Sequence, residues 1–176
     1  MPTENTANRQ REKSLKVIRL MLAIVAAGLV LAGLTTFWLP WEVTRLLDVV
    51  FQRSSTAVPF FSTEYRMLLQ VEKGLQYLQQ NFPQFFLGTD YLGFAHIMFA
   101  LLFIGAIRDP LKNLWTIQFG MIAAALVIPG AFVFGTVRGL PVMHYFIDAS
   151  FGIGAIIPFY IALREAKKIS RLPEPA

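Results

Sequence analysis

Four long apolar segments, separated by short polar or charged stretches, dominate the pattern along the chain. A helix needs about 20 apolar residues to cross the hydrocarbon core of a bilayer, and most of these segments reach that length. We therefore expect four membrane-spanning helices, at residues 17–39, 91–107, 110–136 and 142–163. The second segment is the shortest, so its helix either starts before residue 91 or crosses a thin part of the bilayer.

The segment at residues 41–86 shows a different pattern, in which apolar residues recur at helical spacing between polar ones. This pattern predicts two amphipathic helices, one from Trp41 to Arg53 and one from about Thr63 to Asn81. In the second helix we expect Glu64, Glu72 and Lys73 to face outward. The predicted fold class is an all-α integral membrane four-helix bundle, with two extracytoplasmic amphipathic helices between spans 1 and 2.

The helix ends carry recognisable signals. Thr89 or Asp90 is the expected N-cap of the second span. Asp109 is the expected N-cap of the third, with Pro110 at its first helical position. Pro129 lies inside the third span and predicts a kink there, because proline removes one helical hydrogen bond.

Composition and charge agree with a membrane location. The chain of 176 residues is 55% hydrophobic and only 15% charged, whereas soluble domains carry about 25% charged residues. Its net charge of +5 does not indicate nucleic acid, because the basic residues lie at the ends of apolar segments. The absence of cysteine excludes disulfides and thiolate metal sites.

The distribution of basic residues predicts the orientation. Eleven of the 16 Lys and Arg residues lie in the first 19 residues, in the turn at 108–113 and from residue 164 onward. By the positive-inside rule, both termini are then cytoplasmic and residues 41–86 lie outside. We expect residues 1–16 to be a disordered cytoplasmic tail and residues 164–176 to be a second cytoplasmic tail. The membrane domain is expected at residues 17–163.

Two histidines and one acid are the main polar residues inside the spans. His96 follows Asp90 by six residues and Asp148 follows Val142 by six, so each is expected about 9 Å below the outer surface. His144 lies one helical turn from Asp148, on the same face. The second and fourth spans are expected to bring these three side chains together, and three further residues are expected nearby: Tyr91, Arg138 and Tyr145.

Several interpretations of this group remain open. Two histidines and a carboxylate suit a divalent metal, and His96 and His144 suit the axial positions of a haem or chlorin. His96 and Asp148 alternatively form a polar centre for protons or for a lipid-like ligand, in a binding protein or an enzyme. The structural alternative is that Asp148 pairs with His96 or Arg138, while His144 faces water at the interface.

Five short motifs give the chain a resemblance. They are GLTTF at 33–37, FAH at 94–96, IGAIRDP at 104–110, FGMIA at 119–123 and IDASFG at 147–152. In this combination the chain resembles small bacterial four-span inner-membrane proteins of unassigned function. The resemblance implies a multi-pass protein of the bacterial cytoplasmic membrane and carries no particular activity.

The expected role is that of a non-enzymatic accessory or binding subunit of a membrane complex. Nine aromatic residues lie between Phe51 and Tyr91, a density that requires lipid headgroups or protein to cover it. The sequence contains no phosphate-binding loop, dinucleotide-binding motif, zinc-protease motif or serine-hydrolase elbow. We therefore expect contact with the bilayer and with a membrane-protein partner or a second copy of the chain.

Overall fold

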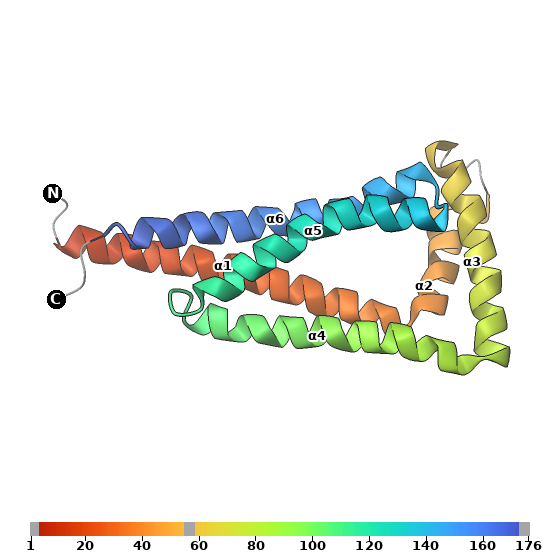
Figure 1. The fold of residues 1–176 in the computed structure, drawn as a ribbon, viewed down its shortest axis with the longest axis horizontal. Helices are drawn as coiled ribbons and strands as arrows, with labels where there is room; N and C mark the ends of the chain where they lie inside the picture. The colour runs from red at the N-terminus through yellow and green to blue at the C-terminus, as the bar shows by residue number, and fades with distance from the viewer. Residues whose placement is uncertain (1–3, 55–58, 173–176) are drawn as a thin grey trace.

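The computed structural model describes residues 4–54 and 59–172, and within those ranges every regular element is a helix (Figure 1). Four helices are long: α1 (Glu4–Phe37), α4 (Leu87–Arg108), α5 (Leu114–Arg138) and α6 (Val142–Ile169). Shorter elements connect α1 to α4: α2 (Leu39–Arg45), the π-helix η1 (Leu46–Val50), the 3-10 helix η2 (Pro59–Phe61), α3 (Ser62–Asn81) and the 3-10 helix η3 (Pro83–Phe86).

The expected number of membrane spans is confirmed. Four segments of the described residues are long and apolar enough to cross a bilayer: Thr6–Phe37, Pro83–Arg108, Leu114–Arg138 and Val142–Ile169. The chain is therefore a small multi-pass membrane protein, and its apolar helices belong in a lipid bilayer.

The ends of two spans differ from the sequence-based expectation. The helix α4 begins at Leu87, and η3 leads into it, so the short second span gains one turn. Asp90 lies inside this helix, and Thr89 donates a hydrogen bond to the carbonyl of Phe86 at 2.8 Å. The expectation of an N-cap at Thr89 or Asp90 was wrong, because the preceding 3-10 turn continues directly into the helix.

The third span begins at Leu114 and not at Pro110. Asp109 lies in the turn that precedes α5, where the backbone N–H and the ammonium group of Lys112 lower its pKa. The side chain of Asn113 donates to the carbonyls of Gly105 and Asp109 at 3.2 and 2.9 Å. These two carbonyls also accept the backbone N–H groups of Asp109 and Asn113, so the side chain of Asn113 adds a second hydrogen bond to each in the turn before α5.

The N-terminal region was expected to be disordered, but residues 4–16 are the first turns of α1. They are ordered because α1 continues along the end of α6. Ser14 is 4% exposed and donates to a carboxylate oxygen of Glu165 at 2.8 Å. Likewise α6 extends to Ile169, beyond the expected end at residue 163. Residues 1–3 and 173–176 of the two expected tails lie outside the described residues.

All four spans share a core at the end of the molecule where the termini lie (Figure 1). The ring of Phe159 in α6 lies 5.4 Å from that of Phe103 in α4. Arg19 of α1 donates to the carbonyls of Ile107 and Arg108 at 3.1 and 3.2 Å, which satisfies acceptors at the last turn of α4. The buried members of this core are Ile18, Leu22, Phe103, Ala106, Ile117, Ala124, Phe159, Ala162, Ala166 and Ile169.

Glycine allows α1 and α4 to approach closely. A Cβ atom on Gly93 would lie 2.1 Å from the hydroxyl oxygen of Thr36 and 2.6 Å from the carbonyl oxygen of Gly33. A Cβ atom on Gly33 would lie 2.6 Å from the carbonyl oxygen of Gly93. Because neither distance leaves room for a side chain, this crossing requires glycine on both helices.

A second glycine contact runs along α5 and α6. The ring of Phe159 lies over Gly120, and the ring of Tyr145 lies over Gly135, each 2.3 Å from the position that a Cβ atom would occupy. Between them, a Cβ atom on Gly152 would lie 2.6 Å from the carbonyl oxygen of Ala124. The two helices are therefore in close contact along most of their length.

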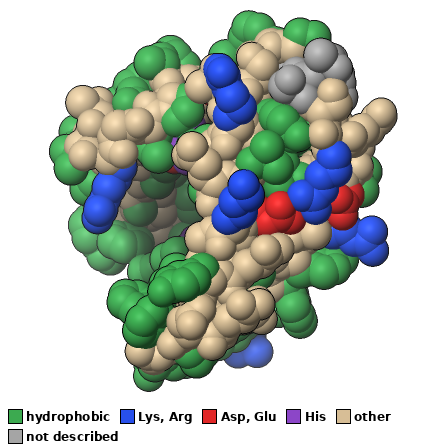
Figure 2. Space-filling view, turned by 90° about the vertical axis from the view of Figure 1, so that its right-hand side faces the viewer, with side chains coloured by type: hydrophobic (Ala, Val, Ile, Leu, Met, Phe, Trp, Pro, Cys, Tyr) green, Lys and Arg blue, Asp and Glu red, His purple; other side chains and the backbone are tan. Residues whose placement is uncertain are grey.

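The α1–α4 pair and the α5–α6 pair separate toward the end opposite the termini (Figure 1). There α2 and α3 extend across the gap between the pairs. Seen from this end, the space-filling view shows a hollow beside α3, with a histidine side chain at its margin (Figure 2). The bundle is thus closed at one end and open at the other.

The segment that crosses the open end has a small core of its own, made of Val43, Leu47, Phe51 and Tyr65. The first three are four residues apart, so they lie on one helical face. Two acids that were expected to face outward are buried instead: Glu64 is 6% exposed and Glu72 is 8% exposed. For these two positions the expected face of α3 was wrong.

We predict that Gly152→Ala destabilises the protein and that Gly154→Ala does not. The first substitution forces the α6 backbone away from Ala124, and overpacking of this kind costs about 1–3 kcal/mol. A Cβ atom on Gly154 meets nothing within 4 Å, and alanine favours a helix over glycine by up to about 1 kcal/mol. Thermal unfolding of both variants in mild detergent measures the difference. Equal midpoints would contradict the close contact of α5 and α6.

Candidate functional site

The structure pairs two of the expected site residues on α6. The Nε2 atom of His144 lies 3.4 Å from a carboxylate oxygen of Asp148, one helical turn further along. The two side chains are 31% and 43% exposed. This local pair gives Asp148 a partner without help from another helix.

The third expected residue, His96, lies on α4 and is turned toward α1. Its Nδ1 atom is 2.8 Å from the carbonyl oxygen of Leu92, and its Cβ atom would lie 3.2 Å from a Cβ atom placed on Gly33. Within the described residues no hydrogen bond or ion pair joins His96 to His144 or Asp148.

The start of α4 at Leu87 helps to explain why His96 does not contact His144 or Asp148. His96 is nine residues from Leu87, or about 14 Å along the helix, whereas Asp148 is about 9 Å from the start of α6. The two residues therefore do not lie at matching depths from the starts of their helices. In addition, the α1–α4 and α5–α6 pairs separate in this part of the molecule (Figure 1).

Two further candidates are exposed and lie at helix ends. Tyr91 is 70% exposed in the second turn of α4. Arg138 is the last residue of α5 and is exposed, and Gly139 closes the helix with φ of 62°. No hydrogen bond or ion pair involving either side chain occurs in residues 4–54 and 59–172.

The arrangement of histidines and acids bears on the expected cofactors. Among the described residues there is no group of three His, Asp or Glu side chains close enough to hold a metal ion. Axial ligation of a haem or chlorin by both histidines would require α4 and α6 to converge near His96 and His144. In the structure each histidine instead contacts its own helix.

A network that sequence reasoning missed joins η1 to α3 around Arg53. The guanidinium group of Arg53 contacts both carboxylate oxygens of Glu72, at 2.7 and 2.9 Å, and one oxygen of Asp48 at 2.5 Å. The hydroxyl of Thr44 donates to Glu72 at 2.9 Å, and that of Tyr65 donates to the carbonyl of Arg53 at 2.7 Å. Arg53 has φ of 55°, in the left-handed region that non-glycine residues rarely adopt.

The charges of this network stabilise one another. The hydrogen bonds from Arg53 lower the pKa of Glu72, burial opposes them, and the hydroxyl of Thr44 adds to the lowering. Hydrogen bonds to Glu72 and Asp48 raise the pKa of Arg53 above its usual value. The periodicity of α3 placed Glu72 on an outward face, because it contains no information on a partner that lies 19 residues earlier in the chain.

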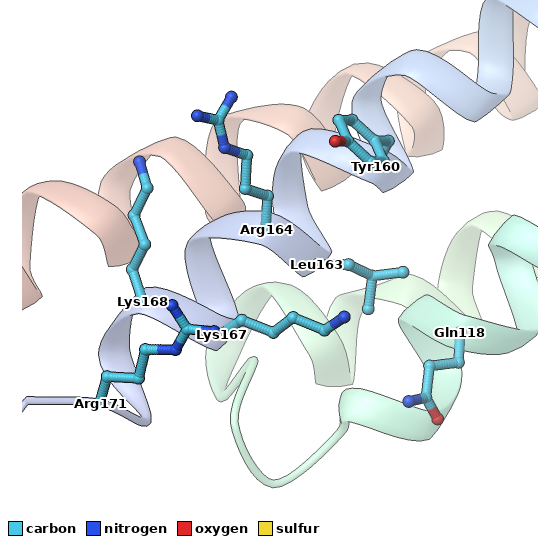
Figure 3. Close-up of a pocket in the computed structure, with 7 residues that line it drawn as sticks. All are labelled: Gln118, Tyr160, Leu163, Arg164, Lys167, Lys168 and Arg171. Atoms are coloured by element: carbon cyan, nitrogen blue, oxygen red, sulfur yellow. The ribbon is translucent and has the colours of Figure 1, made fainter.

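A basic groove lies between the first turns of α5 and the last turns of α6 (Figure 3). Its volume is about 480 Å³. Four cationic side chains line it, together with the side chains of Tyr160 and Leu163 and the amide of Gln118. The lining residues are Gln118, Tyr160, Leu163, Arg164, Lys167, Lys168 and Arg171.

A second groove, of about 580 Å³, lies at the opposite end, where α1 meets α2 and α3 leads into α4. Aromatic rings form much of its wall, and two prolines, three polar side chains and one acid line the remainder. These residues are Phe37, Trp38, Trp41 and Phe86, with Pro40, Pro83, Thr44, Gln76, Gln79 and Asp90. Neither groove is lined by His96, His144 or Asp148.

No family model, curated protein or solved structure matches the chain.

We predict that Glu72→Gln speeds amide exchange in α3 at neutral pH and has no such effect in acid. The folded state lowers the pKa of Glu72, so its contribution is complete above the unfolded value of about 4.3 and is lost as the pH falls through the folded value. Loss of this partly solvent-screened pair costs about 1 kcal/mol, or about fivefold in amide exchange.

The measurement is the ratio of α3 amide exchange between variant and wild type at each pH. Glu12→Gln, an exposed acid on α1, is the control and leaves the exchange of α3 unchanged. A ratio that stays constant from neutral pH to well below the unfolded pKa of about 4.3 would show that the Glu72 carboxylate does not hold α3.

Proposed function

We propose that this chain is a non-enzymatic accessory subunit, which binds a partner protein in the membrane through the segment that crosses the open end of the bundle. The observation that supports it most directly is a continuous group of exposed aromatic rings at the end of α3. The rings of Tyr77 and Phe82 lie 6.1 Å apart, and those of Phe82 and Phe85 lie 6.2 Å apart. We call Tyr77, Phe82 and Phe85 the aromatic patch; they are 59%, 41% and 64% exposed.

The aromatic patch is attached to an ordered support. The Arg53–Glu72 ion pair and the small core around Leu47 and Tyr65 hold α3 against η1 and α2. Large aromatic side chains on a fixed surface are the residues that contribute most to protein interfaces, since they bury much area and lose little conformational entropy.

Lipid headgroups are the main alternative cover for these rings, since aromatic residues also gather at the membrane surface. The residues around Tyr77 favour a protein. Lys73 precedes Tyr77 by four residues and Gln80 follows it by three, so both lie beside it on the same helical face, and both are exposed. An exposed apolar group surrounded by polar residues is typical of a protein-binding surface.

The proposal includes an orientation and a location. We place both termini in the cytoplasm, because the basic residues gather at the end of the molecule where the termini lie. The aromatic patch is then extracytoplasmic, and the resemblance to small bacterial four-span proteins favours the cytoplasmic membrane. Neither His144 nor Asp148 is required for this role, and we assign their pairing to the stability of α6.

The test compares two double variants in membranes of the native host, solubilised in mild detergent. Tyr77→Ala with Phe85→Ala removes two rings of the aromatic patch. Phe134→Ala with Phe151→Ala removes two rings from the spans, where Phe134 and Phe151 are 71% and 70% exposed. We expect the wild type to migrate in an assembly larger than the 19.8 kDa monomer. The patch variant is expected to bind its partner about thirtyfold more weakly and to leave the assembly, as the loss of interface aromatics implies.

The control variant is expected to remain in the assembly. A monomeric wild type would overturn the proposal, and so would an assembly that survives loss of the patch but not loss of the rings on the spans.

A further inference from the structure

The basic groove lies at the end of the molecule that carries both termini, at the level where α6 leaves its apolar stretch (Figures 1 and 3). In the close-up, Lys167 extends along the groove toward Leu163, and Arg171 reaches toward Lys167 from the turn that follows α6 (Figure 3). Gln118 lies across from them on α5 and also lines the groove. The groove therefore has an apolar wall on the side of the membrane core and cations at its mouth.

The charges of the groove are poorly balanced by the protein. Lys168 forms an ion pair with Glu165, which also accepts the hydrogen bond of Ser14 from α1. Arg164, Lys167 and Arg171 have no carboxylate within ion-pair distance among the described residues. Lys167 and Arg171 thus approach each other at the groove without a carboxylate partner in that part of the chain, whereas Arg164 points away from them and interacts with Glu165 (Figure 3).

Gln118 adds an independent observation. It lies four residues into α5, about 6 Å along the helix, and its exposed side chain has no hydrogen-bond partner in the described part of the chain. A carboxamide at this depth in a span normally bonds to another helix, because lipid tails offer no partner. Here it faces the groove instead, where it can bond to a polar group of a bound molecule.

We propose that the groove binds the headgroup of an anionic phospholipid from the leaflet on the side of the termini. Lys167 and Arg171 contact the phosphate, Gln118 bonds to the glycerol or ester oxygens, and the acyl chain lies along Leu163 and Tyr160. Basic pockets between membrane helices bind anionic headgroups by this combination of charge and apolar wall. A volume of about 480 Å³ lies within the range of small-molecule sites.

The experiment is native mass spectrometry of the purified full-length chain in neutral detergent, titrated with phosphatidylglycerol or with phosphatidylcholine. We expect the wild type to retain phosphatidylglycerol preferentially. Lys167→Gln with Arg171→Gln is expected to lower the bound fraction about tenfold or more, because each basic residue near the headgroup contributes several-fold in affinity. Gln118→Leu is expected to weaken retention while leaving the net charge unchanged.

Lys13→Gln with Lys16→Gln is the matched control. It removes two exposed cations of α1 at the same end of the molecule, and it is expected to retain the lipid. Equal binding of the two lipids, or equal losses in the two double variants, would overturn the proposal, because either result indicates only a general charge effect. Displacement of the lipid by an excess of inorganic phosphate would also overturn it, since the groove would then be a site for free anions.

Discussion

Close contact between helix backbones at glycine is the constraint on which the rest of this structure depends. Lipid tails are as apolar as the side chains of the spans, so the hydrophobic effect does not drive helices together inside a bilayer. Van der Waals contact must hold them, and it increases as the backbones approach. Gly33 and Gly93 provide this approach between α1 and α4, and Gly152 provides it between α5 and α6, where Gly120 and Gly135 leave room for the rings of Phe159 and Tyr145. Large apolar residues elsewhere on the spans remain exposed, as lipid contact allows.

The polar interactions between helices lie away from these glycine contacts. At the end near the termini, Arg19 satisfies the last carbonyls of α4, and Ser14 bonds to Glu165. At the other end, Arg53 and Glu72 hold α3 across the space between the two helix pairs. These contacts lie near the ends of the spans or outside them, where the cost of placing a charge is lower than in the hydrocarbon core.

The sequence was sufficient to predict the helical class and the four spans, because the length and apolarity of a segment determine whether it can cross a bilayer. It was insufficient where a partner from another part of the chain decides the outcome. Ser14 appeared to lie in a disordered tail, because nothing near it in the sequence indicates Glu165. Glu72 appeared to face water for the same reason, since its partner Arg53 follows from tertiary contact. Of the candidate site, the His144–Asp148 pair could be read from helical spacing, whereas the position of His96 depends on the path of α4.

The two helix pairs are joined at one end and separated at the other, and distances between spin labels test this arrangement most directly. The chain has no cysteine, so labels can be attached to two engineered pairs: Ile104 with Trp115, near the end where the termini lie, and Tyr91 with Val137, near the open end. All four side chains are exposed. We expect the distance between the second pair to be clearly longer than that between the first. Equal distances would indicate a bundle in which all four helices pack together along their whole length, and would contradict the separation of the two pairs.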